Sequence, residues 1–251
     1  MEKLAQGAKA LGLSLTSEQL QTFETYWAEI AVWNERLNLT AVTELGEAQT
    51  RHFLDSLTVL LAFPRARDSI ASCDDHLTVL DVGAGAGFPG LPLRIACPNL
   101  TLTLLEATKK KVAFLRHVIK ALGMDPSSRG AGQAVMVVEG RAEEVAHLSQ
   151  YRESFDIVVA RAVARLSSLA ELCLPFNRVG GRFIAMKGAD VSEEVEEARG
   201  AFSALGGSLL EVRQVELPDV LPSRSLVVVS KVQPTPQKYP RRPGIPVKRP
   251  L

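Results

Sequence analysis

Residues 80–90, Leu-Asp-Val-Gly-Ala-Gly-Ala-Gly-Phe-Pro-Gly, decide the fold of this chain. The apolar and β-branched residues 77–80 that begin this region are typical of a buried strand. Pro89 suits the first turn of a helix, where a missing N–H costs nothing. Glycine is needed where a backbone turns through positive φ and comes close to a ligand, because it carries no Cβ. The stretch therefore predicts a strand, a glycine turn that holds a nucleotide-like cofactor, and a helix.

From residue 77 onward the predicted strands and helices alternate. Alternation of this kind predicts an α/β fold with a mainly parallel sheet that helices cover on both faces. Only residues 217–223 separate the last two strands, so these strands should form a hairpin and bring an antiparallel strand into the sheet. We expect strands at 77–82, 101–106, 135–139, 155–160, 182–187, 209–216 and 225–231, and helices at 89–96, 109–122, 141–149, 166–175 and 190–205.

The chain divides into three regions by composition. Residues 1–65 are predicted to be a helical N-terminal extension, because Thr16 and Gln19 have capping-box spacing and apolar residues follow at helical steps. A second helix is expected at about 47–61. Residues 66–232 form the predicted cofactor-binding domain, with a polar loop at 68–75 before the first strand. Residues 233–251 are rich in proline and basic residues, which predicts an extended, stiff tail that follows a phosphate backbone, with a disordered terminus as the alternative.

Charge is unevenly distributed in a chain whose net charge is only +1. Residues 106–124 carry five basic residues against one acidic residue, whereas residues 190–200 carry five acidic residues against one basic residue. This asymmetry predicts one face that meets a polyanion. The three cysteines have no CxxC spacing, which argues against a zinc site, so we expect no metal. No leader or long apolar stretch is apparent, so we expect a cytoplasmic protein without membrane contact.

The glycine turn fits two cofactors. From Gly85 the pattern is that of a dinucleotide site, whereas from Gly83 it is G-x-G-x-G, as in S-adenosylmethionine (SAM) sites. Both need an acidic residue at the end of the next strand for the ribose hydroxyls, and Glu106 meets this need. We favour SAM, because a helical region precedes the turn and too few residues follow for a separate substrate domain. An oxidoreductase that uses NAD is the alternative.

Several motifs in combination resemble the glucose-inhibited division protein B family, the bacterial small-subunit ribosomal RNA guanine-N7 methyltransferases. The similarity covers most of the chain and is specific only in combination. The matching motifs are residues 51–57, the glycine turn at 81–90 and residues 161–164, together with Asn38-Leu39-Thr40, residues 106–111, Arg141-Ala142-Glu143, Met186-Lys187-Gly188 and, in the tail, Tyr239-Pro240-Arg241-Arg242.

The resemblance implies a class I SAM-dependent methyltransferase. Its Rossmann-like sheet would have seven strands, mostly parallel, with an antiparallel last strand. The substrate would be N7 of a guanine in 16S ribosomal RNA, position 527 in the usual numbering, either in free RNA or in the small ribosomal subunit, and we expect the protein to act as a monomer. The resemblance implies cofactor contacts at Gly83, Phe88, Glu106, Ala107, Thr108, Ala142, Glu143 and Arg161. The glycine pattern itself adds Gly85 as a further candidate contact.

The chemistry of guanine N7 demands little of the protein. N7 has a free lone pair and can attack a sulfonium methyl without first losing a proton, so no general base is required. Arg161 and Lys187 end neighbouring predicted strands at the ligand edge, and we take them as candidate catalytic residues. Because N7 must stay open, such a cation should contact O6 or phosphate only. Arg161 could instead hold the cofactor carboxylate, and Lys187 could be an ordinary surface lysine.

Basic residues supply candidate contacts to RNA. A solvated helix face would explain the lysine run about as well as phosphate binding does, and His52 could equally be a packed helix residue. A non-catalytic RNA-binding or assembly protein with the same fold is a further alternative. The candidate RNA contacts are Arg51, His52, Lys109, Lys110, Lys111, Arg241 and Arg242.

Overall fold

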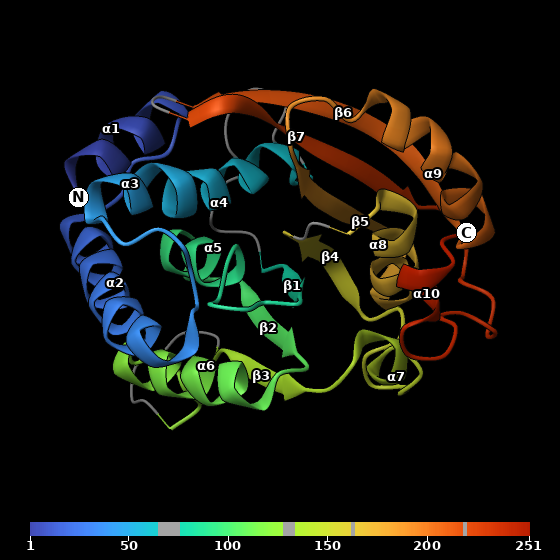
Figure 1. Ribbon diagram of the computed structural model, residues 1–251, viewed down its shortest axis with the longest axis horizontal. Coiled ribbons are helices and arrows are strands. Elements are labelled where there is room, and N and C mark those ends of the chain that lie inside the picture. The colour runs from blue at the N-terminus through green and yellow to red at the C-terminus, as the bar shows by residue number, and fades with distance from the viewer. Residues whose placement is uncertain (65–75, 128–133, 162–163, 218–219) are drawn as a thin grey trace.

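The computed structural model describes residues 1–64, 76–127, 134–161, 164–217 and 220–251 (Figure 1). It confirms the predicted alternation. The strands are β1 (Thr78–Val82), β2 (Thr101–Glu106), β3 (Met136–Glu139), β4 (Phe155–Ala160), β5 (Asn177–Lys187), β6 (Gly207–Leu217) and β7 (Val220–Lys231). The helices between them are α5 (Gly90–Ala96), α6 (Lys109–Ala121), α7 (Ala142–Val145), α8 (Leu166–Cys173) with a 3-10 turn η3 (Leu174–Phe176), and α9 (Ser192–Ala204).

All seven strands form one sheet in the order β3-β2-β1-β4-β5-β7-β6. The first five strands pair in parallel, and β7 lies antiparallel between β5 and the edge strand β6. The predicted hairpin is thus confirmed. The parallel strands bring the ends of β1, β2 and β4 to one edge, where ligands bind in open α/β sheets.

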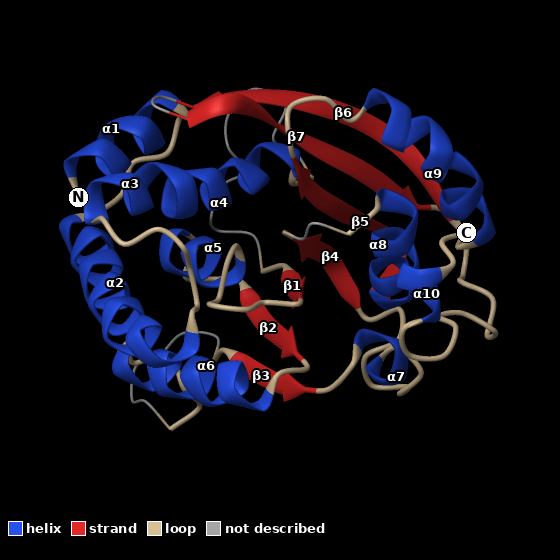
Figure 2. Cartoon of the chain, in the orientation of Figure 1, coloured by secondary structure: helices blue, strands red, loops and turns tan. Residues whose placement is uncertain are grey.

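The sheet separates two hydrophobic layers, because neighbouring residues of a strand face opposite sides. On β1, Val79 packs with the N-terminal helices, α5 and α6, whereas Leu80 packs with α7, α8 and α9. The same division holds on β4 for Ile157 and Val158. Figure 2 shows the helices on either side of the strands.

The N-terminal helices cover one face of the sheet. They are α1 (Glu2–Ala10), α2 (Ser17–Leu37) and α3 (Leu45–Ala48), followed by a π turn η1 (Gln49–Leu54), α4 (Asp55–Leu57) and a 3-10 turn η2 (Thr58–Ala62). The capping box is confirmed, with Thr16 and Gln19 exchanging side-chain and backbone hydrogen bonds. The helix predicted at 47–61 is present but changes its hydrogen-bond pattern three times. The expected loop at 68–75 lies outside the described residues.

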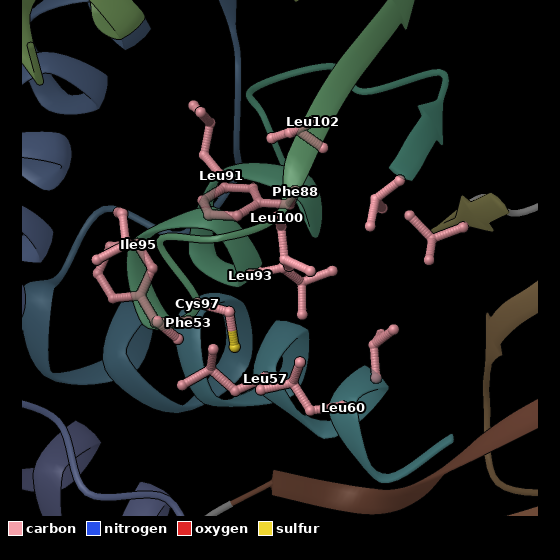
Figure 3. Close-up of a cluster of buried hydrophobic side chains, with 14 of the residues drawn as sticks. Phe53, Leu57, Leu60, Phe88, Leu91, Leu93, Ile95, Cys97, Leu100 and Leu102 are labelled. Atoms are coloured by element: carbon pink, nitrogen blue, oxygen red, sulfur yellow. The ribbon is translucent and has the colours of Figure 1, made fainter. Parts of the chain in front are cut away.

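Phe53 joins the N-terminal helices to the glycine turn. Its ring centroid lies 5.0 Å from that of Phe23, 5.7 Å from Tyr26 and 6.0 Å from Phe88. Phe53 is fully buried, and Figure 3 shows it in the same cluster as Phe88, Leu91 and Ile95. The predicted extension therefore shares its core with the sheet.

The expectation of an extended, unfolded tail is wrong. The Arg152 guanidinium donates to the carbonyl oxygens of Thr235 (2.8 Å), Pro236 (3.2 Å) and Tyr239 (3.0 Å). A final helical turn, α10 (Ile245–Lys248), packs against α8. Proline removes backbone donors but leaves carbonyl acceptors, and a partly buried arginine from a distant segment satisfies these acceptors. Composition alone does not reveal such a partner.

Among the helices of the described ranges, none is both long enough and apolar enough to cross a membrane.

Phe53 provides a test of this packing. Phe53→Ala should lower the free energy of unfolding by about 3–5 kcal/mol, because it removes a buried ring and leaves a cavity. Val32 on α2 is 60% exposed, so Val32→Ala should change the free energy by less than about 0.5 kcal/mol. Urea unfolding of both variants checks this, and equal effects would contradict a shared core.

Candidate active site

The turn between β1 and α5 adopts a backbone conformation that needs glycine at three positions. Gly83, Gly85 and Gly87 all have positive φ, of 75°, 60° and 97°, a region that other residues enter only with strain. The backbone N–H groups of Gly83 and Ala84 donate to the carbonyl of Leu105 on β2, at 2.8 and 3.1 Å. The turn is thereby attached to the neighbouring strand.

Glu106 lies at the end of β2 and holds the turn with its side chain. Its Oε2 accepts a hydrogen bond from the Gly85 N–H at 3.0 Å, and its Oε1 accepts one from the Thr108 N–H at 2.7 Å. The residue is only 7% exposed. Each carboxylate oxygen has further acceptor capacity, so ribose hydroxyls can bind without displacing the backbone.

Gly83 leaves open space beside Glu106. A Cβ built on Gly83 would meet no heavy atom within 4 Å, and the residue is exposed. A charged acceptor next to an open, backbone-lined turn fits the adenosyl part of the predicted cofactor. In the described parts of the chain, no group of three or more His, Cys, Asp or Glu residues could hold a metal ion.

Tyr26 of α2 fixes the far side of the turn. Its buried hydroxyl donates to the Ala86 carbonyl at 2.6 Å. Burial raises the pKa of this hydroxyl well above its usual value, so the group stays a donor. A Cβ on Gly87 would lie 2.6 Å from the Tyr26 oxygen. Sequence reasoning missed Tyr26, because helical periodicity marks a buried residue but not the partner of its hydroxyl.

Asp81 of β1 is a second residue whose role the sequence did not reveal. It is fully buried, and its Oδ2 accepts a hydrogen bond from the Gly90 N–H at 2.8 Å, which attaches α5 to β1. Its Oδ1 is buried without a hydrogen-bond partner. Burial raises the pKa of this carboxyl to about 7. Its place within the glycine motif was the available signal.

His52 is packed, as the alternative interpretation of the sequence proposed. Its ring stacks on Phe88 at 4.6 Å between centroids, and its Nε2 lies 2.6 Å from the Thr40 hydroxyl. Burial, aided by the charge of Arg161, lowers its pKa to about 4. Its Nδ1 lies 3.0 Å from the Arg161 guanidinium and 3.1 Å from the Arg51 carbonyl oxygen, so both ring nitrogens are occupied by protein groups. A neutral histidine cannot serve as a cation for RNA phosphates.

Arg161 connects the end of β4 to the N-terminal helices. Its guanidinium donates to the Arg51 carbonyl at 3.0 Å, lies 3.4 Å from Asp55 and sits 5.7 Å from the centre of the Phe88 ring. The side chain of Asp55 is 3% exposed and also faces Arg224 at 3.4 Å. The nitrogen that faces Asp55, Nη1, is buried and makes no hydrogen bond, so the pairing of Arg161 with Asp55 rests on charge.

Lys187 is neither a surface lysine nor unpaired. Its side chain is 10% exposed, and its Nζ donates to the Ala164 carbonyl at 2.9 Å and to Glu194 at 2.8 Å. Glu194 also accepts a hydrogen bond from the Leu166 N–H at 2.7 Å. The alternative of an ordinary surface lysine is therefore wrong, and Lys187, the candidate catalytic residue, would first have to leave Glu194.

The structure also brings the end of β3 close to Glu106. The Gly140 N–H donates to the Glu106 carbonyl at 3.1 Å, so α7, which begins with Ala142 and Glu143, starts beside the turn. Ala107 and Thr108 are exposed.

The predicted RNA contacts differ in how available they are. Lys109, Lys110 and Arg242 are exposed, and Lys111 is partly exposed. Arg51 is exposed but paired with Glu47 at 2.6 Å, and Arg241 is bound to the buried Glu171.

The strand order, with an antiparallel β7 and a glycine turn after β1, defines a class I, SAM-dependent methyltransferase. One solved structure shares the fold with a TM-score of 0.54 at 16% identity, covering 82% of this chain and 98% of the other; it comes from the complex between the Haloferax volcanii Trm112 methyltransferase activator and a methyltransferase.

Sequence comparison identifies the family. The model of the family GidB, rRNA small subunit methyltransferase G, matches residues 19–226. The Ribosomal RNA small subunit methyltransferase G of Dehalococcoides mccartyi (strain CBDB1) is 45% identical over 251 residues, all of both chains. The Brevibacillus brevis protein of the same name is 42% identical over 250 residues, 100% of this chain and 98% of the other. The chain belongs to this family, and the resemblance inferred from its motifs is confirmed.

The buried Asp81 carboxyl should make the free energy of unfolding depend on pH. A carboxyl whose pKa is raised on folding favours the folded state below its unfolded pKa of about 4, and this contribution is lost as pH rises through about 7. Asp81→Asn keeps an acceptor for Gly90 but cannot ionise. Between pH 4 and 8 the stability of Asp81→Asn should therefore rise relative to the wild type, by up to roughly 4 kcal/mol. Urea unfolding at several pH values measures this difference, and a constant difference would contradict the assignment.

Alanine in place of Gly87 should mainly lower stability, whereas alanine in place of Gly83 should mainly weaken cofactor binding. Gly87→Ala should destabilise the protein by about 2–3 kcal/mol, because alanine is strained at this positive φ and its Cβ would displace the Tyr26 hydroxyl. Gly83→Ala should cost only about 1 kcal/mol yet weaken binding of S-adenosylhomocysteine at least tenfold, since its Cβ enters the open space. Thermal unfolding and calorimetric titration separate the two. Full affinity in Gly83→Ala would exclude a cofactor beside that residue.

Proposed function

We propose that this protein transfers a methyl group from SAM to N7 of a guanine in 16S ribosomal RNA. The observation that carries the proposal is the Glu106 carboxylate, which lies at the end of β2 next to the open turn at Gly83. Membership of the rRNA small subunit methyltransferase G family supplies the substrate class. The NAD-dependent alternative has no support from the family, and a non-catalytic assembly protein remains an outcome of the test.

The cofactor is held by groups of four kinds. Glu106 accepts hydrogen bonds from the ribose hydroxyls, since both its oxygens keep acceptor capacity, Oε2 beside Gly85 and Oε1 beside Thr108. The backbone at Ala142 and Glu143, beside Ala107 and Thr108, receives the adenine. Arg161 binds the cofactor carboxylate through its guanidinium, whose Nη1 faces Asp55 at 3.4 Å without a hydrogen bond. Phe88, between Tyr26 and His52, forms an apolar wall.

The reaction needs positioning rather than proton removal. Bound SAM supplies an electrophilic methyl group, which guanine N7 attacks with its own lone pair, so an N–C bond forms as the S–C bond breaks. No proton leaves N7 in this step. In-line alignment and exclusion of water account for a large part of such a barrier. Arg161 and Lys187 lie at the ends of neighbouring strands, and Lys187 reaches O6 or a phosphate only after exchange of Glu194.

RNA binding is assigned to the exposed basic groups. Lys109, Lys110 and Lys111 begin α6 directly after the cofactor edge, and Arg51 and Arg242 are also exposed. Phosphate contacts of this kind make affinity fall steeply with salt. The substrate is 16S RNA or the small ribosomal subunit, and we propose that the protein acts on it as a monomer in the cytoplasm.

Replacement of Glu106 tests the cofactor assignment. Glu106→Ala should raise the dissociation constant of S-adenosylhomocysteine about tenfold, because a hydrogen bond to a charged group, worth roughly 1.5 kcal/mol, is lost. Glu139 ends the adjacent strand β3, paired in register with Glu106, so Glu139→Ala is a matched control. Calorimetric titration measures both constants. The assignment fails if the two variants bind alike, or if NAD binds in place of the cofactor.

The same preparations test the reaction. Labelled SAM should transfer methyl to 16S RNA with the wild type, and cleavage of the RNA at N7-methylated guanine should map to one nucleotide. Glu106→Ala should need more SAM for the same rate. Cofactor binding without any transfer to RNA or to small subunits would favour the non-catalytic alternative.

A further inference from the structure

The C-terminal tail, residues 233–251, folds against the helix that the proposed function places beside the adenine. Figure 1 shows it in red, with α10 near its end, beside α7 and α8. Glu143 in the first turn of α7 is 93% buried, and its Oε1 accepts a hydrogen bond from the Gly244 N–H at 2.8 Å. Gly244 has a φ of +81°, in the left-handed region that favours glycine. The Glu143 side chain is therefore directed at the tail.

The tail is clamped on both sides of Gly244. Before it, Arg241 makes a two-pronged ion pair with Glu171 of α8, with nitrogen–oxygen distances of 2.6 to 3.1 Å, and its backbone N–H adds a bond of 2.7 Å. The Glu171 side chain is fully buried. After it, the Ser168 hydroxyl of α8 donates to the Pro246 carbonyl at 2.8 Å. These bonds hold Gly244 at a defined position.

The contact between α7 and the tail combines apolar packing with hydrogen bonds and leaves a groove. A groove of about 630 Å³ separates them in part, lined by Glu143, His147, Arg241 and Arg242 among others. Besides the Glu143 bond, His147 contacts the Pro240 carbonyl at 2.9 Å. Tyr239 of the tail packs against the apolar cluster that contains Val145 and Ala146, and these two hydrogen bonds give that contact a defined direction.

We propose that Glu143 and Arg241 are positioning residues, through which the folded tail holds the adenine-binding turn at Ala142 and Glu143 in place. Arg241 fixes the tail on Glu171, Gly244 fixes the Glu143 carboxylate, and the carboxylate fixes the backbone that meets the adenine. The inference rests on the proposed function, because it takes the adenine position from it. Arg241 thereby acts on the cofactor from a distance and does not need to touch RNA.

Two adjacent arginines allow a matched test in the full-length protein. Arg241→Met should raise the dissociation constant of S-adenosylhomocysteine and the KM for SAM about five- to tenfold, with kcat at saturating SAM changed less than twofold. Arg242 is exposed, and no ion pair is recorded for it within the described ranges. Arg242→Met should leave cofactor affinity unchanged and weaken RNA binding at low salt. Arg241→Lys, which keeps a charge but not the fork, should restore part of the affinity.

A double-mutant cycle with Glu143→Ala tests whether Arg241 acts on cofactor binding through Glu143. Arg241→Met should weaken cofactor binding only when Glu143 is present, because both act through the same bond. If the effects of the two substitutions add, or if Arg241→Met leaves cofactor affinity unchanged while Glu143→Ala weakens it, the inference is overturned and the proposed site stands. If Glu143→Ala leaves the affinity unchanged, the Glu143 carboxylate does not position the cofactor and the inference is likewise overturned, whereas failure of the wild type to bind S-adenosylhomocysteine would overturn the proposed function itself. Should Arg241→Met not fold, Arg241→Lys takes its place in the cycle under the same criteria.

Discussion

The glycine turn after β1 is held from two opposite sides. The Glu106 carboxylate accepts from the Gly85 N–H, and the Tyr26 hydroxyl donates to the Ala86 carbonyl. Consecutive residues of one turn are thus fixed by a strand of the sheet and by a helix of the N-terminal region. Glycines adopt the positive φ that the turn needs but are the most flexible residues when unfolded, so the two hydrogen bonds convert a flexible stretch into a preformed cofactor site.

The N-terminal helices consequently do more than extend the domain. They contribute Tyr26 to the turn, Phe53 to the core beneath Phe88, and the neutral His52 to the stack above it. Asp55 from the same region lies between Arg161 and Arg224. A segment that faces RNA in the proposed function is therefore in direct contact with the cofactor edge, which is the arrangement that a reaction controlled by alignment requires.

Prediction from the sequence succeeded where local pattern decides the outcome and failed where the partner is distant in the chain. The strands were found because alternating elements leave a local hydrophobic pattern, and Glu106 was found because its position relative to the glycine turn is set by one strand–helix unit. Lys187, His52 and Arg241 were harder. Their partners Glu194, Thr40 and Glu171 come from other elements, and no local signal identifies them.

The amino-acid sequence alone determined the class of fold, the glycine turn and the family, because strand–helix periodicity and short motifs are local properties. Only the tertiary structure decided which charged groups are available to a ligand. The composition of the basic, proline-rich tail predicts an extended arm. The tail folds nevertheless, because Arg152 donates to its backbone carbonyls and Glu171 pairs with its Arg241. Whether a charge meets solvent or a buried counter-charge depends on what the fold places next to it, and composition does not contain that information.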